Sequence, residues 1–116
     1  MEKFMYLFRG GENHAHNAAD SEAAAKNMQA WMNWMGSLQQ KGILAGGEPL
    51  QPTGKQISGK KMVITDGPFA EAKEMVGGFL IVNAKDINEA VELSKGCPIF
   101  EEDGHLEVRP IQKMEM

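Results

Sequence analysis

Asp66 is the residue of this sequence best suited to move a proton. It follows the apolar run Val63–Thr65 and precedes Gly67 and Pro68. Glycine tolerates a positive φ and proline fixes its own φ, so Asp-Gly-Pro can hold a carboxylate on a rigid turn. Beside apolar strands, such a carboxylate can act as a general base. The alternative is an Asx-turn, in which Asp66 only accepts backbone N–H groups.

A dense group of charges, Glu71, Lys73 and Glu74, follows this turn. If the segment forms one helical turn, Glu71 and Glu74 lie on the same face at i, i+3. With Lys73 beside them, they could bind a polar ligand. The alternative is a solvated turn, whose exposed ion pairs contribute little to stability.

Arg109 lies in an alternating segment, Leu106–Gln112. If Leu106 and Val108 enter the core, Glu107 and Arg109 share the opposite face. A buried guanidinium needs a carboxylate, which the acidic residues at the Asp-Gly-Pro turn and just after it could supply. Arg109 then either stabilises an interface through a salt bridge or anchors a substrate carboxylate.

Histidine and cysteine are sparse and poorly spaced for metal binding. His14 and His16 could supply ligands together with Asp20 or His105. However, His-x-His in a polar loop does not direct both rings to one point, so we expect no metal. Cys97 follows a predicted helix C-terminus, where the dipole opposes thiolate formation, and is read as a packing residue. The glycines match neither a dinucleotide-binding nor a Walker pattern, and we expect no cofactor.

Five apolar segments are predicted to form the strands that position these residues. Residues 51–60 between them read as a polar turn region, and Asp66-Gly67-Pro68 is expected to end the strand before it. Gly46 and Gly47 indicate a bulge or a close backbone approach. The predicted strands are Lys3–Arg9, Ile43–Leu50, Lys61–Thr65, Val76–Ala84 and Leu106–Gln112.

Two amphipathic helices are predicted. The first is capped by Asp20 or Ser21 and ends at Gly42, and Trp34 lies off the centre of its stripe, as a candidate for a pocket or an interface. Its apolar stripe is Ala24, Met28, Trp31, Met35 and Leu38. The second begins after the cap Asp86 and closes at Lys95 and Gly96. Its predicted inner face is Ile87, Ala90, Val91 and Ser94.

The order β-α-β-β-β-α-β, with the short second strand merged into the neighbouring turn, predicts an α+β, ferredoxin-like antiparallel sheet covered by two helices. We expect one domain over residues 1–116. Two helices cover only one face of such a sheet, yet several strands are apolar on both faces. A second copy of the chain is the economical cover. We therefore predict a homodimer built sheet against sheet, a dimeric α+β barrel.

Composition narrows the class of protein. The chain has 116 residues, 42% hydrophobic and 24% charged, with a net charge of −4. This balance is typical of a globular domain and does not favour nucleic-acid binding. The single cysteine cannot form an intrachain disulfide, so we expect a reducing, cytoplasmic setting. No apolar run is long enough to span a membrane, and residues 1–9 are too short for a secretory signal.

The segment Val63–Glu74 resembles the signature of the YCII-related (DGPF-domain) family, through Asp66-Gly67-Pro68-Phe69. Other matches occur in the family's order, so that the resemblance covers residues 3–112. One position departs from the family pattern: Ala72 stands where the family commonly has Thr. These matches are Gly46–Leu50, Gly77–Val82, Gly96-Cys97-Pro98 and Glu107–Ile111.

The resemblance implies a small ferredoxin-like dimer, similar in fold to cofactor-free monooxygenases and muconolactone isomerases, whose sites lie between sheet and helices. It also implies acid–base work by a His/Asp pair, in which His14 would assist Asp66. From the residue types and positions alone, Arg109, Lys73, Glu71, Glu74 and Trp34 would bind the substrate.

The sequence is compatible with two functions. One is a cofactor-free acid–base enzyme acting on a small organic metabolite. The other is a non-catalytic module that binds a ligand or a protein in a sigma-factor-linked regulatory circuit, as the genetic setting of the family implies.

Overall fold

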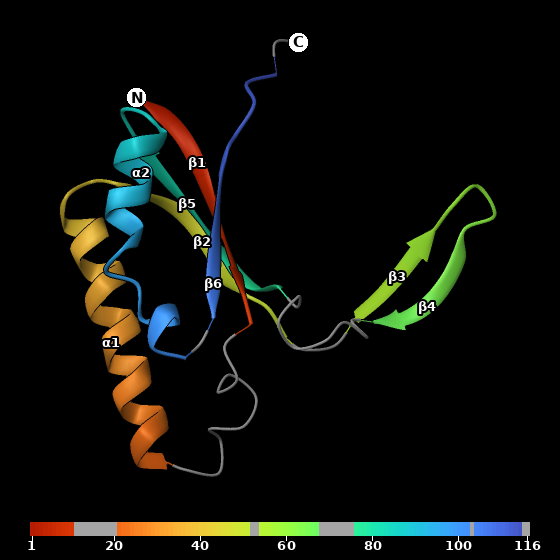
Figure 1. The fold of residues 1–116 in the computed structure, drawn as a ribbon, viewed down its shortest axis with the longest axis horizontal. Coiled ribbons are helices and arrows are strands. Elements are labelled where there is room, and N and C mark those ends of the chain that lie inside the picture. Colours follow the sequence, from red (N-terminus) through yellow and green to blue (C-terminus); the bar gives the residue numbers. More distant parts are fainter. Residues whose placement is uncertain (11–20, 52–53, 68–75, 103, 115–116) are drawn as a thin grey trace.

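The computed structural model describes residues 1–10, 21–51, 54–67, 76–102 and 104–114. The elements follow one another as β1 (Glu2–Arg9), α1 (Ser21–Gln40), β2 (Leu44–Pro49), β3 (Gly54–Ser58), β4 (Val63–Gly67), β5 (Val76–Ala84), α2 (Ile87–Ser94), the 3-10 helix η3 (Pro98–Glu102) and β6 (His105–Pro110). Four strands form an antiparallel sheet in the order β2-β5-β1-β6 (Figure 1). The α+β class and the two helices are as predicted.

The core lies between the main sheet and the helices, which cover one side of it (Figure 1). Strand β1 alternates as expected for a pleated strand. Phe4, Tyr6 and Phe8 are buried against the helices, while Met5 and Leu7 are half-buried on the other side. Pro110 ends β6, an edge strand of the sheet, where a missing N–H is tolerated.

Helix α1 ends as predicted, because Gly42 adopts φ 71° after the last turn. The buried stripe is rotated relative to the prediction: Trp31, Met35 and Leu38 face the core as predicted, but Met28 does not. Trp34 is only 8% exposed and stacks on Tyr6, with its Nε1 donating to the carbonyl oxygen of Leu93, whereas Met28 is 61% exposed. The apolar surface of this helix is wide, and the hydrogen bond of the indole decided which part of it faces the sheet.

Helix α2 begins after Asp86, whose carboxylate accepts the Glu89 N–H at 2.9 Å, as predicted for an N-cap. Its inner face is narrower than expected. Ala90 and Ser94 are buried, but Ile87 and Val91 are exposed. Small residues face the sheet because the Tyr6 hydroxyl reaches the backbone here and donates to the Ala90 carbonyl oxygen.

Residues 54–67 form a two-stranded hairpin, here called the arm, and this region departs most from the prediction. Residues 51–60 were predicted as a turn, yet β3 occupies much of them and pairs with β4. Asp66 and Gly67 continue β4 instead of ending it. Strand β3 lacked a sequence signal because it is polar and exposed along its whole length, with no buried face to impose an alternation.

Candidate functional site

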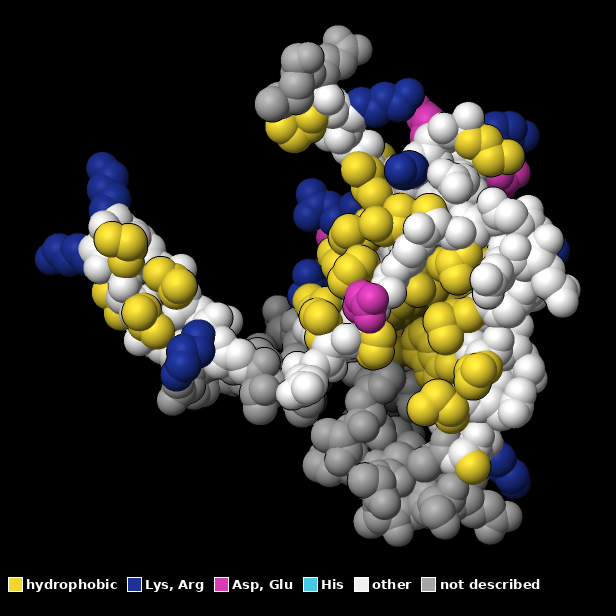
Figure 2. Space-filling model, turned by 180° about the vertical axis from the view of Figure 1, so that it is seen from behind, with side chains coloured by type: hydrophobic (Ala, Val, Ile, Leu, Met, Phe, Trp, Pro, Cys, Tyr) yellow, Lys and Arg dark blue, Asp and Glu magenta, His cyan; other side chains and the backbone are white. Residues whose placement is uncertain are grey.

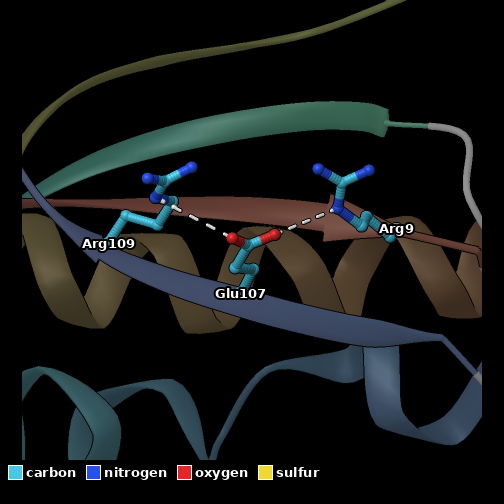
Figure 3. A network of polar contacts seen from close by, with 3 residues as sticks. All are labelled: Arg9, Glu107 and Arg109. Carbon is cyan, nitrogen blue, oxygen red and sulfur yellow. Dashed lines mark hydrogen bonds and ion pairs between the residues drawn. The ribbon is translucent and has the colours of Figure 1, made fainter.

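Three charged side chains meet on the side of the main sheet that the helices leave uncovered. Glu107 lies between two arginines: Arg9 Nε is 3.2 Å from its Oε1, and Arg109 Nε is 3.8 Å from its Oε2 (Figure 3). The terminal nitrogens of the two guanidinium groups point the same way in this view. Two positive charges against one carboxylate leave the cluster with a net charge of +1.

The register of the strands creates this cluster. Residues directly opposite one another on neighbouring strands share a face of the sheet. Leu7 faces Glu107 and Met5 faces Arg109, so the three charges share a face with apolar residues of β1. Strand β5 adds Phe79 opposite Leu7 and Ile81 opposite Met5. We call this side the open face, defined by Met5, Leu7, Arg9, Phe79, Ile81, Glu107 and Arg109.

The open face combines a net positive charge with an apolar floor. All four apolar residues are half-buried, while the Arg109 side chain is 67% exposed. Ion pairs at such exposure contribute between about 0 and 1 kcal/mol to stability, so the fold does not depend on them. Guanidinium groups bind carboxylates and other planar oxyanions well. The face is therefore suited to hold a small organic anion, with its apolar part against β1 and β5.

Two of the predicted site residues are fully described. Arg109 shares a face with Glu107, as the alternation predicts, and forms an ion pair with it. Trp34 belongs to the packed core, where it contacts Tyr6, Phe8 and Trp31, and so the layer between α1 and the sheet is filled at this point. None of these contacts tests the predicted substrate-binding roles.

The other predicted site residues are described in part or not at all. The backbone of Asp66 lies in β4 opposite Lys55, in the arm and outside the main sheet. His14, Glu71, Lys73 and Glu74 lie outside the described residues.

Sequence reasoning missed Arg9, and it considered His105 only as a possible metal ligand. Arg9 ends β1 and lies opposite His105 of β6, so that both are close to Glu107. Along each strand, every second side chain lies on the open face, and Arg9 and His105 fall on these positions. The alternation alone could therefore have identified them. What the sequence lacked was the pairing of the first strand with the last, because that contact joins opposite ends of the chain.

The helix-covered side holds a buried phenol. Tyr6 has no solvent exposure, and its hydroxyl donates to the Ala90 carbonyl oxygen. Burial raises the pKa of Tyr6 to about 12, with a smaller contribution from the charge of Cys97. A phenol that stays protonated to such a pH contributes to the core and is no candidate for proton transfer at neutral pH.

The described residues contain few other features that could bind a metal ion or a ligand. No three of their His, Cys, Asp or Glu side chains lie close enough to hold a metal ion. A depression of about 590 Å³ lies between the start of β1 and residues 110–113, and none of the predicted site residues lines it. No helix among the described residues is long and apolar enough to cross a membrane.

Comparisons with known proteins agree with the fold. The sequence model of the YCII-related domain matches residues 3–115. Comparison with curated proteins gives no match. A solved structure, 5-chloro-2-hydroxyhydroquinone dehydrochlorinase from Burkholderia phenoliruptrix AC1100 in complex with 2,5-dihydroxybenzoquinone, is similar, with a TM-score of 0.51 and 16% sequence identity. The match covers 94% of this chain and 93% of that one, and at this identity it supports the fold alone.

Proposed function

The chain belongs to the YCII-related domain family, and from this premise we propose that it is a cofactor-free enzyme that transfers protons on a small organic anion. The observation that carries the proposal is the pair of arginines around Glu107 on an apolar sheet face. The dehydrochlorinase of similar fold holds a small oxygen-rich ring compound in its structure. A carboxylate or an enolate of that size matches the charge and the apolar floor of the open face.

The proposed chemistry divides the work between two groups. Arg9 and Arg109 hold the anionic oxygens of the substrate and stabilise the negative charge that develops on them. The proposed proton acceptor is the carboxylate of Asp66, whose backbone lies in β4 of the arm, outside the main sheet; it takes a proton from a carbon next to a carbonyl group, leaving an enolate. The protonated Asp66 then returns the proton to another carbon, or the enolate expels a leaving group. His14 would assist Asp66 in these steps.

Binding is tested first, with 2,5-dihydroxybenzoquinone as the probe, in titrations followed by ¹H–¹⁵N NMR. We expect the Arg9, Glu107 and Arg109 signals to shift. The change Arg109→Gln should weaken binding about tenfold, the scale of one charge-assisted hydrogen bond. The control Lys26→Gln removes the same charge from the exposed side of α1 and should leave the affinity unchanged. Equal effects of the two variants would refute a specific anion site.

Proton transfer is tested second, by the exchange of carbon-bound hydrogen for deuterium in D₂O with pooled small organic acids and lactones. We expect the wild-type protein to catalyse exchange in at least one compound. Asp66→Asn should abolish that exchange and leave binding intact, because the amide keeps the shape of the side chain and loses its basicity. Binding without exchange in any pool would contradict the enzyme and favour the ligand-binding module.

A further inference from the structure

His105 begins β6 at the end of the main sheet where β1 finishes. It lies directly opposite Arg9, and Glu107 follows two residues later on the same face. The Cα atoms of opposite residues in an antiparallel pair are about 5 Å apart. The imidazole is therefore a neighbour of the cluster that Glu107 forms with Arg9 and Arg109.

Close packing of the backbone fixes this position. The Gly104 N–H donates to the Ile99 carbonyl oxygen at 3.0 Å. A Cβ on Gly104 would lie 2.6 Å from Ile99 Cγ1 and 3.0 Å from the Arg9 carbonyl oxygen, so that only glycine lets β6 begin so near Arg9. On the other side of β1, the register with β5 shifts between Phe8 and Arg9, as at a β-bulge. Such bulges are frequent beside active sites, where they redirect side chains.

The imidazole of His105 is available for a ligand. It is exposed, and no hydrogen bond or ion pair joins it to another residue that the structure describes. The Glu107 carboxylate, in contrast, is engaged by both arginines. A guanidinium does not release its proton in a protein, whereas an imidazole gains and loses one near neutral pH. His105 is thus the member of this group suited to proton transfer.

An organic anion bound here would meet all the features that it requires. Figure 2 shows hydrophobic side chains gathered over the middle of the main body, with lysine and arginine side chains at the edge. An anion held by Arg9 would bring its oxygens to the imidazole opposite that arginine. Its negative charge favours the imidazolium, which is the form of histidine that donates a proton.

We propose that His105 is a catalytic residue of this site and gives a proton to the oxygen of the enolate. The role rests on the proposed proton transfer by Asp66. As Asp66 takes the proton from carbon, the electrons of that C–H bond form a C=C bond. The imidazolium N–H bond breaks and the O–H bond of an enol forms. When Asp66 returns its proton to carbon, the imidazole takes back the enol proton, and both residues end as they began.

Contact between His105 and a bound anion is tested by NMR with 2,5-dihydroxybenzoquinone as the probe. We expect nuclear Overhauser effects between the ring protons of the probe and those of His105. The His105 ring signals should shift with the same dissociation constant as the Arg109 signals. In Arg109→Gln that constant should rise about tenfold for both sets of signals. A bound probe that leaves His105 unaffected would overturn the inference and leave the anion site in place.

The catalytic role is tested by hydrogen–deuterium exchange at carbon in a compound that the wild type turns over. His105→Gln keeps a polar side chain but carries no proton, and should slow exchange by about 100-fold or more. It should weaken binding of the probe less than Arg109→Gln does. Added imidazole should restore part of the exchange in His105→Ala but none in Asp66→Asn, and a purely structural role of His105 would give no such rescue.

The outcomes separate this role from the activity on which it rests. Exchange by His105→Gln at the wild-type rate would refute the role of His105 and leave the proposed enzyme standing. A wild type that exchanges no compound would refute both. Far-UV circular dichroism checks that each variant keeps the fold, so that a slow variant with an intact spectrum counts as a catalytic defect.

Discussion

At the scale of single residues, Tyr6 joins the sheet to α2. It is fully buried, stacks on Trp34, and donates a hydrogen bond to the backbone of Ala90. A phenol in this position anchors the helix only while it is protonated, because the phenolate has no donor and is poorly solvated by the core. This explains why the pKa of Tyr6 is raised to about 12, mainly by burial.

This shift predicts a specific loss of stability in base. In the unfolded chain Tyr6 ionises near pH 10, whereas in the folded chain it keeps its proton to about pH 12. The unfolded state therefore binds fewer protons in this window, and the free energy of unfolding falls as pH rises, by about 1.4 kcal/mol per pH unit. Below pH 10 this group contributes no pH dependence.

Urea unfolding of the wild type and of Tyr6→Phe between pH 8 and pH 12 measures the effect. Tyr6→Phe should cost about 1 kcal/mol at pH 8, for the lost hydrogen bond. The difference between the two proteins should then shrink or reverse between pH 10 and pH 12. Other groups titrate in both proteins and cancel in the comparison. Parallel curves through this window would show that Tyr6 ionises freely in the folded state.

At the scale of elements, the adjacent glycines of β2 allow the edge strand to lie close to β5. The register shifts between Leu44 and Gly46, as expected for a β-bulge, and Gly47 adopts φ 152°. A Cβ on Gly47 would lie 2.4 Å from Leu80 Cδ2 and 2.5 Å from the Phe79 carbonyl oxygen. A Cβ on Gly46 would meet nothing within 4 Å.

Alanine substitutions at Gly46 and Gly47 allow a matched test of this close approach. Gly47→Ala should lower the free energy of unfolding by about 3 kcal/mol, because both a backbone clash and an unfavourable φ must be relieved. Gly46→Ala should change it by less than about 1 kcal/mol. Urea unfolding at pH 7, followed by tryptophan fluorescence, measures both. Equal costs for the two variants would mean that β2 does not hold the register seen here.

At the scale of the whole molecule, the chain is more extended than its length requires. Its radius of gyration is 15.8 Å, whereas a compact chain of this length has about 13 Å. If the homodimer predicted from the sequence forms, folding and association are linked, because the dimer is favoured by mass action.

Linked assembly makes thermal stability depend on concentration. Raising the protein from 1 to 100 μM should increase the Tm of the wild type by about 5–10 °C, since a hundredfold change in concentration is worth about 2.7 kcal/mol. Differential scanning calorimetry at the two concentrations measures it, and a constant Tm for the wild type would contradict an obligate dimer.

Local signals in the sequence were enough for most of the main sheet and both helices. Asp86 caps α2, Gly42 ends α1, and the glycine pair marks a bulge just before Gly46 and the close approach of Gly47 to β5, because each of these features depends on the conformational preferences of a few neighbouring residues. The order of strands and helices and the family motif can likewise be read from the linear sequence, without knowledge of long-range contacts. Because side chains alternate between the two faces of a strand, the sequence also placed Glu107 and Arg109 on one face of β6.

Tertiary structure alone decided the features that need contacts between distant segments. Arg9 joins Glu107 only because β1 pairs with β6. Trp34 turned into the core because Tyr6 and Leu93 lie opposite it, although the width of the apolar stripe allowed other rotations. The polar strand β3 exists because β4 pairs with it. Backbone pairing and helix rotation are set by free energies summed over the whole assembly, and a local pattern does not contain them.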